Sequence, residues 1–276
     1  ISRSNRVDVF DPETGKVVAS ISGLKGVHQA VFAPKLGEGY TSNGGDSTVT
    51  VFGLKDLKAR ATIKVGDRPD AILFEPKTKR VFTFNAASHD ATAIDAKTHK
   101  VLGSVPLGGK PEFPASDKSG HVFVNVEDTS EVVEFDAGTL KVVKRWSIKP
   151  GEEPTGLAFD EKHERLFSVT GGKMMVSDSK NGKLVATVPI GDGPDAAAYD
   201  PKLGLIFASN GAGTLTVVKE KDKDHFEVIQ TLPTQRGART CVLDPKTHRI
   251  FLVAADTVEP VGGGRRTVVP GSFTVL

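Results

Sequence analysis

A repeat of about 42 residues constrains the fold of this chain more than any other sequence feature. Its clearest copy runs from Gly66 to Leu107. The residues equivalent to Pro69 recur at Val27, Pro69, Pro111, Pro154, Pro194 and Ala238. A period of this length, with about four short strands per unit, is typical of a β-propeller blade. The repeat therefore predicts a single all-β propeller domain over residues 1–276.

Each repeat contains four predicted strands, named a to d in chain order. Strand a is apolar and ends in a turn, as in Ala71–Pro76, and strand b carries an aromatic residue such as Phe82. Strand c alternates, as in Thr48–Phe52, whereas strand d is more polar, as in Val101–Val105. The recurring aromatic residue predicts packing between neighbouring blades rather than a surface for stacking bases. The predicted blades are a partial one at 1–22, then 23–65, 66–107, 108–149, 150–190, 191–234 and 235–276.

The two ends of the chain bear on the number of blades. Five complete repeats are followed by strands a, b and c, whereas the chain begins with only a c and a d strand. Two c strands cannot occupy one blade, so a closed ring of four-stranded antiparallel blades requires seven. We therefore expect a seven-bladed propeller that is N-terminally shortened as given. A six-bladed ring that leaves the last strand over is the alternative.

Composition narrows the classes of partner. Lys and Arg number 36 against 34 Asp and Glu, a formal net charge of +2, so we expect no nucleic-acid ligand, which would require a concentrated basic surface. No apolar run approaches the roughly 18 residues of a membrane span, and no signal peptide is present in this chain. The single Cys241 excludes an intrachain disulfide and a Cys-based zinc site, and its apolar neighbours predict a buried small side chain.

The repeated motif resembles a known family. Gly66–Ala71 (GDRPDA) and Gly191–Ala196 (GDGPDA), followed by D-P-K-T-x-R and D-x-x-T-x-K-V turns, resemble the YVTN or YncE-like family of bacterial seven-bladed propellers. The resemblance covers essentially the whole chain. It implies an exported protein, periplasmic or extracellular, that is usually without demonstrated catalysis. It also implies a likeness to the propeller domains of some lactonases and periplasmic oxidoreductases.

Strand direction predicts where a binding site would lie. In a four-stranded antiparallel blade the d–a connection and the b–c turn lie at the same end, and strand a is innermost. The residue after each repeat marker therefore faces the central channel, and these residues are His28, Asp70, Glu112, Thr155, Asp195 and Arg239. The b–c turns add Asn43, Asn85, His89 and Asn210 to the same face. A purely turn-forming role also accounts for Asp70, Asp195, Asn43 and Asn210.

His28, Glu112 and Arg239 depart from the repeat, and the scaffold alone gives no reason for that asymmetry. The sequence contains no Gly-x-Ser-x-Gly elbow, His-Glu-x-x-His motif or P-loop. We therefore expect a non-catalytic, monomeric binding or protein-interaction scaffold without a cofactor. Its partner would be an unidentified protein or a small polar ligand bound at the channel face.

Three alternatives remain open. His28, Asp70, Glu112 and Asp195 can offer nitrogen and oxygen ligands to a divalent metal, as in a metal-assisted hydrolase or lyase of the lactonase type. Arg239, with Arg68 and Lys110, can hold an anionic ligand instead. A propeller subunit of a periplasmic redox system is the third, with any haem or copper held by another subunit because Cys-x-x-Cys-His is absent.

Two segments interrupt the repeat. A charged insertion at Lys219–Phe226 replaces the short c–d turn of its unit and is expected to be a solvated loop. The long segment Asp256–Ser272, rich in Gly and Pro, replaces the last b–c turn. Long loops on a rigid scaffold often carry function. Gly262–Arg266 within this one is expected to be a disordered loop, with contact to an acidic partner as the alternative.

Overall fold

The structure is a computed structural model that describes residues 5–258 and 267–276. It consists of antiparallel strands and one short 3-10 turn, η2 (Pro34–Leu36), so the predicted all-β class is confirmed. No helix in the described part of the chain is long or apolar enough to cross a membrane. The chain divides into two compact units, Ile1–Ser147 and Ile148–Leu276, and the prediction of a single domain stays a prediction.

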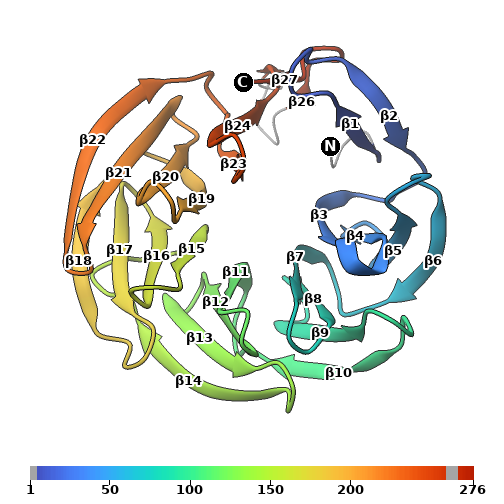
Figure 1. Ribbon diagram of the computed structural model, residues 1–276, viewed down its shortest axis with the longest axis horizontal. Coiled ribbons are helices and arrows are strands. Elements are labelled where there is room, and N and C mark those ends of the chain that lie inside the picture. The colour runs from blue at the N-terminus through green and yellow to red at the C-terminus, as the bar shows by residue number, and fades with distance from the viewer. Residues whose placement is uncertain (1–4, 259–266) are drawn as a thin grey trace. The chain divides into compact units, whose positions relative to one another are not determined.

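Three four-stranded sheets make up most of the first unit, and in each the strands pair in chain order (Figure 1). The first sheet contains β3 (Val27–Ala33), β4 (Glu38–Asn43), β5 (Thr48–Gly53) and β6 (Ala59–Lys64). The second contains β7 (Pro69–Glu75), β8 (Arg80–Asn85), β9 (Asp90–Asp95) and β10 (Val101–Pro106). The third contains β11 (Pro111–Ser116), β12 (His121–Val126), β13 (Glu131–Asp136) and β14 (Lys141–Ser147). The unit also holds the hairpin β1 (Val7–Phe10) and β2 (Val17–Ile21).

The second unit repeats the arrangement. Its first sheet contains β15 (Leu157–Asp160), β16 (Arg165–Thr170), β17 (Lys173–Asp178) and β18 (Leu184–Pro189). The next contains β19 (Pro194–Asp200), β20 (Leu205–Asn210), β21 (Thr214–Asp222) and β22 (His225–Pro233). The last contains β23 (Thr240–Asp244), β24 (Arg249–Ala254) and β27 (Thr274–Val275). β25 (Thr257–Val258) pairs antiparallel with β26 (Thr267–Val268). Gly262–Arg266, expected to be a disordered loop or a contact for an acidic partner, lies outside the described residues.

In the described residues, six sheets of three or four strands form the blades of a propeller. This number matches the six-bladed ring that the sequence offered as the alternative to seven blades. The hairpin β1–β2 pairs with no other described strand, and β27 completes the last sheet beside β24. The two predicted c strands, β1 and β27, thus lie in different sheets. A seventh blade therefore stays a prediction.

The recurring aromatic residue of strand b lies between neighbouring sheets. Phe82 of β8 is fully buried and contacts Phe135 of the next sheet edge-on, with ring centroids 5.2 Å apart. Tyr40 is equally buried and donates a hydrogen bond to the carbonyl oxygen of Ala96, 2.8 Å away. The predicted role in packing between blades is confirmed, since these contacts exclude water from the seam between two sheets.

Turn chemistry explains why most of the repeats carry Asp before the c–d turn. The Asp95 carboxylate accepts the backbone N–H groups of Lys97 and Thr98 at 3.0 and 2.7 Å, and Asp136 repeats this arrangement. His99 closes the turn with a positive φ of 59°. These local bonds replace the ladder bonds that the chain loses as it reverses direction.

Candidate functional site

Three predicted site residues occupy equivalent places in the first unit. His28, Asp70 and Glu112 are the second residues of β3, β7 and β11. Each strand shows a register shift directly after its first residue, at Val27/Ala30, Pro69/Ile72 and Pro111/Pro114. A bulge interrupts the hydrogen-bond ladder and redirects the side chains beside it. The repeat therefore supplies three irregular strand starts, and the sequence places a different polar side chain on each.

The structure joins two of these side chains directly. His28 Nδ1 lies 3.0 Å from Asp70 Oδ1, and both side chains are about two-fifths exposed, at 42% and 43%. Glu112 is more enclosed, at 12%, and its Oε1 accepts a bond from Lys110 Nζ at 2.8 Å. Lys110 also contacts Glu127, so one ammonium group serves two carboxylates. We call His28, Asp70, Lys110, Glu112 and Glu127 the polar row.

Charge and burial set the protonation of the polar row. Burial opposes ionisation of Asp70, but its bond to His28 and the nearby charges of His28 and Lys110 outweigh burial and lower its pKa. Burial raises the pKa of Glu112 to about 7, because the compensation from Lys110 is incomplete and the carboxylates of Asp70 and Glu127 lie nearby. For Lys110, burial is outweighed by its bonds to Glu112 and Glu127, which raise its pKa.

The predicted residues of the second unit contact one another. Asp195 Oδ2 lies 3.2 Å from Arg239 Nε, although the Arg239 side chain is 65% exposed. The Thr155 hydroxyl donates to the carbonyl oxygen of Pro194 at 3.1 Å. The predicted metal set is thus divided between the units, with Asp195 paired to Arg239. It stays a prediction, as does the anion site of Arg239 with Arg68 and Lys110.

The predicted asparagines are buried inside their own hairpins. Asn43, Asn85 and Asn210 are each at most 1% exposed. Asn85 Nδ2 donates to Asp90 Oδ1 and Thr92 Oγ1 at 3.0 and 2.9 Å, and the other two bond the equivalent Thr hydroxyls. His89, by contrast, is exposed at a turn position with φ of 57°. The asparagine amides therefore fasten strand b to strand c.

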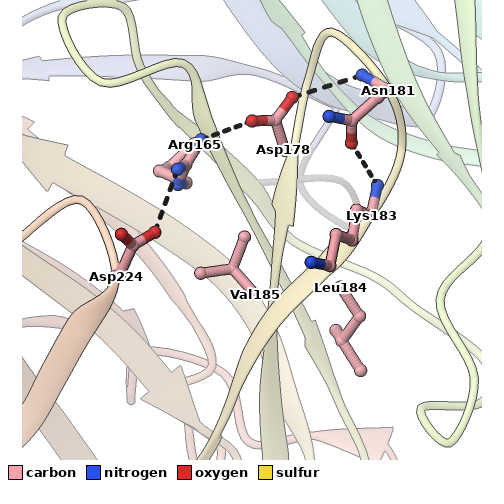
Figure 2. A pocket seen from close by; sticks show the side chains of 7 residues that line it. All are labelled: Arg165, Asp178, Asn181, Lys183, Leu184, Val185 and Asp224. Atoms are coloured by element: carbon pink, nitrogen blue, oxygen red, sulfur yellow. Dashed lines mark hydrogen bonds and ion pairs between the residues drawn. The ribbon is translucent and has the colours of Figure 1, made fainter.

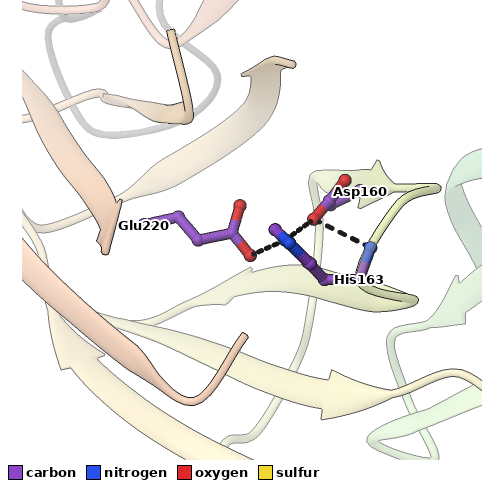
Figure 3. A group of neighbouring side chains, drawn as sticks. All are labelled: Asp160, His163 and Glu220. Atoms are coloured by element: carbon purple, nitrogen blue, oxygen red, sulfur yellow. Dashed lines mark hydrogen bonds and ion pairs between the residues drawn. The ribbon is translucent and has the colours of Figure 1, made fainter. Parts of the chain in front are cut away.

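A cluster that the sequence did not predict lies in the second unit. Asp160 ends β15, His163 lies in the following turn, and Glu220 comes from β21 of the next sheet (Figure 3). His163 Nδ1 is 2.7 Å from Asp160 Oδ2 and 3.1 Å from Glu220 Oε1. Among the described residues this is the group of three or more potential metal ligands whose ligand atoms all lie within 4.8 Å of one another.

Burial dominates the electrostatics of this cluster. It raises the pKa of Glu220, to which the charge of Asp160 adds, although Tyr199 and His163 bond the carboxylate. Tyr199 donates its hydroxyl to Glu220 Oε2 at 2.6 Å, and burial together with that bond raises the tyrosine pKa. The sequence signal was a His in an a–b turn. Its carboxylate partner Glu220 is 57 residues away, which no local pattern reveals.

A hollow of about 440 Å³ lies beside β16 and β18, lined by Arg165, Asp178, Asn181, Lys183, Leu184, Val185 and Asp224 (Figure 2). Arg165 is only 5% exposed and pairs with Asp178 at 2.8 Å and Asp224 at 3.2 Å. It also donates to the carbonyl oxygen of Lys223 at 2.7 Å. The insertion at Lys219–Phe226, expected to be a solvated loop, instead forms the end of the β21–β22 hairpin and holds this arginine. The charges of Arg165, Asp178 and Asp224 in the lining are thus paired with one another.

Cys241 of β23 is partly exposed rather than fully buried, in contrast to the prediction. It packs beside an apolar cluster that includes Phe207 and Leu252. Burial of the sulfur raises the pKa of the Cys241 thiol to about 11. The thiol is therefore protonated at neutral pH, as expected for a packing residue rather than a nucleophile.

Comparison with known proteins places the fold but not the family. No family model matches the chain. Antigen Lp49 of Leptospira interrogans serogroup Icterohaemorrhagiae serovar copenhageni (strain Fiocruz L1-130) is 24% identical over 217 residues, which are 74% of this chain. Those residues are 48% of the antigen, so the chain spans about half the length of this curated relative.

Two solved structures resemble the whole fold. A chain of hydrazine synthase from Kuenenia stuttgartiensis superposes with a TM-score of 0.80 at 16% identity, over 91% of this chain and 87% of that one. A functionally unknown protein from Desulfotomaculum acetoxidans DSM 771 superposes with a TM-score of 0.78 at 13% identity, over 100% of this chain and 96% of that one. At these identities the likeness concerns the fold alone. The chain is an all-β protein of four-stranded antiparallel blades in a propeller arrangement.

Proposed function

We propose that this chain is a non-catalytic binding scaffold that holds a polar ligand, or a polar segment of a partner protein, on the polar row. The observation that carries the proposal is the asymmetry of three equivalent strand starts, at which His28, Asp70 and Glu112 replace one another. If these positions served only to fold the repeat, one type of side chain would be enough at all three. Three different side chains at one register indicate that they serve a ligand.

The charge of the polar row favours a ligand with an ammonium or guanidinium group. The three carboxylates Asp70, Glu112 and Glu127 outnumber the two basic groups His28 and Lys110, and Asp70 and His28 are accessible to a ligand. Charge-assisted hydrogen bonds to a carboxylate are roughly twice as strong as neutral ones. A Lys or Arg side chain of a partner segment, or a small amine, fits this chemistry.

The remaining parts of the proposal rest on the sequence. The GDRPDA and GDGPDA motifs support kinship with the YVTN or YncE-like propellers, and that resemblance supports export to the periplasm or beyond the cell. We further propose that the protein works as a monomer and without a cofactor. The metal-assisted hydrolase and the redox subunit remain alternatives that the described contacts leave untested.

The test compares two short peptides of equal length, one rich in Lys and one rich in Glu, by isothermal titration calorimetry. The Lys peptide should bind, and more tightly at pH 8 than at pH 6 because Glu112 ionises in that interval. The double variant Asp70→Asn/Glu112→Gln should lose at least tenfold in affinity, whereas Glu152→Gln, an exposed carboxylate elsewhere, should not.

Equal affinity in the double variant and the parent would remove the polar row from the proposal. Failure of the Lys peptide to bind at millimolar concentration, or equal binding of the Glu peptide, would count against the cationic ligand class. Hydrolysis of a simple lactone by the parent, lost in Glu112→Gln, would replace the scaffold with the hydrolase alternative.

A further inference from the structure

We infer that Asp160, His163 and Glu220 form a binding site for a divalent transition-metal cation, Zn²⁺ in the first place, which ties two neighbouring sheets of the second unit together. The three side chains point toward one another from β15, the following turn and β21 (Figure 3). The site is separate from the polar row and is independent of the proposed binding function.

The distances suit a cation of this size. Zinc binds histidine nitrogen at about 2.0–2.1 Å and carboxylate oxygen at about 2.0–2.2 Å, so tetrahedral ligand atoms lie roughly 3.3 Å apart. His163 Nδ1 lies 2.7 and 3.1 Å from the two carboxylate oxygens, and all three ligand atoms fall within 4.8 Å. Small side-chain shifts would therefore be enough to admit the ion.

The outer oxygen of each carboxylate is held by a separate donor, and the inner oxygen is directed at His163 Nδ1. The inner oxygen of Asp160 also accepts the backbone N–H of His163 at 3.2 Å. Asp160 Oδ1 accepts the backbone N–H of Lys162 at 3.0 Å, and Glu220 Oε2 accepts the Tyr199 hydroxyl at 2.6 Å. Donors that orient ligating carboxylates in this way are typical of metal sites and tune their affinity. Two oriented oxygens thus converge on one nitrogen.

The hydrogen bonds of this cluster satisfy the carboxylate oxygens but leave the charge uncompensated, because among the described residues His163 is the one basic side chain that pairs with Asp160 or Glu220. The side chains of Asp160 and Glu220 are 1% and 2% exposed, yet a single ring nitrogen faces both carboxylates. One N–H group can make only one strong hydrogen bond. Arg165, which donates to the carbonyl oxygen of His163 at 3.0 Å, is already paired with Asp178 and Asp224 (Figure 2). A divalent cation would contact both carboxylates and the imidazole at once and balance the two buried charges.

The ligand set selects the kind of metal. One imidazole with two carboxylates favours zinc, and less strongly manganese, over the oxygen-preferring calcium. His163 is 29% exposed, so water can reach its side of the cluster and complete the coordination. Because Asp160 and Glu220 belong to different sheets, the bound ion would act as a cross-link between two blades.

The chain supplies a matched control pair. His248 Nδ1 lies 2.7 Å from Asp200 Oδ2. This contact joins the sheet of β19 to the sheet of β23 and β24 through one histidine and one carboxylate. No third carboxylate or imidazole completes that pair as a metal-ligand group in the described residues. Replacing His248 should therefore leave metal binding intact, whereas replacing His163 should not. A general effect of removing a partly buried histidine would appear in both variants.

The experiment uses the whole chain with Cys241→Ser as background, stripped with chelator and titrated separately with ZnCl₂, MnCl₂ and CaCl₂ by calorimetry. One equivalent of Zn²⁺ should bind, raise the thermal midpoint, and bind more tightly than Mn²⁺, with Ca²⁺ weakest. His163→Gln should abolish the stoichiometric binding, and His248→Gln should retain it. Tyr199→Phe keeps all three ligands but loses the orienting hydroxyl, so its zinc affinity should fall by about 10–100-fold.

Absence of stoichiometric Zn²⁺ binding in the background protein would overturn the inference. Equal losses in His163→Gln and His248→Gln would do the same, because the effect would then be general rather than local. Should His163→Gln fail to fold, as judged by circular dichroism, Tyr199→Phe decides the question: an unchanged zinc affinity refutes the site.

Discussion

At the scale of single residues, Glu112 is the most unusual group of the polar row. Its side chain is 12% exposed, and burial raises its pKa from 4.5 to about 7 despite the bond from Lys110. The folded protein therefore holds a proton on Glu112 in a pH range in which the unfolded chain has released it. Stability from this group is complete below about pH 4.5 and is lost as the pH rises through about 7.

The first prediction concerns Glu112→Gln. A shift of this size corresponds to roughly 3 kcal/mol of free energy of unfolding across the interval. The amide does not titrate, so the variant should lose much of the decline in stability between pH 5 and pH 8. It should also be more stable than the parent at pH 8. Urea unfolding at pH 5, 6, 7 and 8 measures how the free energy of unfolding changes with pH in the parent and in the variant.

Glu152→Gln serves as the control for this prediction. It removes an exposed carboxylate outside the polar row and leaves Glu112 and its partners in place. The decline in stability with pH that the parent shows should persist in this variant. A decline that is unchanged in Glu112→Gln would show that Glu112 is not the group that titrates.

At the scale of the strand and its turn, the buried asparagines decide whether a b–c hairpin closes. Asn85 uses both amide hydrogens within the hairpin, on Asp90 and Thr92. The Thr92 hydroxyl also accepts the backbone N–H of Gly66 at 3.1 Å, which ties the incoming connection to the hairpin. Asn210 and Thr216 repeat this link with Gly191. The amide is thus the centre of a small network that each of these blades reuses.

The second prediction is that Asn85→Ala destabilises the protein by ~2 kcal/mol, because a buried hydrogen bond to Thr92 and a partly buried one to Asp90 are lost. Chemical denaturation against the parent measures the loss. His89→Asn, in the same turn but exposed, should be nearly neutral, since Asn tolerates the positive φ of this position. Comparable losses in both variants would mean that the turn, not the amide, carries the stability.

At the scale of the whole molecule, the turn carboxylates act together. The backbone N–H groups of Thr98 and Thr139 lower the pKa of Asp95 and Asp136. For Asp200, burial is outweighed by the bond from His248 and by backbone donors, and its pKa is lowered as well. Groups with a lowered folded pKa contribute stability above their ordinary pKa of 3.8 and lose it as the pH falls further.

The third prediction follows from this sum. The urea midpoint should fall steeply between pH 5 and pH 3, in a window separate from that of Glu112. The double variant Asp95→Asn/Asp136→Asn keeps an oxygen acceptor in each turn but removes the charges. Its urea midpoint should therefore fall less between pH 5 and pH 3 than that of the parent. Urea midpoints of the parent and the double variant at pH 5, 4 and 3 measure the decline in each protein. Equal declines in the two proteins would assign the acid unfolding to other carboxylates.

Much of the fold and part of the site follow from the sequence. The marker residues locate the strand starts, the aromatic residues locate the seams between sheets, and the aspartates locate the turns. The pairing of His28 with Asp70 agrees with their equivalent positions in adjacent repeats. The burial of the Asn85 amide does not follow from the sequence, because a polar residue next to a turn is exposed in many proteins and its neighbours in the chain do not distinguish the two cases.

The sequence by itself determined the repeat, its strands and its turns, because these depend on residues close together in the chain. Tertiary structure alone decided which charges meet. Lys110 is shared by Glu112 and Glu127, and Glu220 reaches His163 from the next sheet. Such contacts depend on how neighbouring sheets pack and where their strands bulge. A 42-residue period predicts that sheets adjoin but not which side chains fill the space between them.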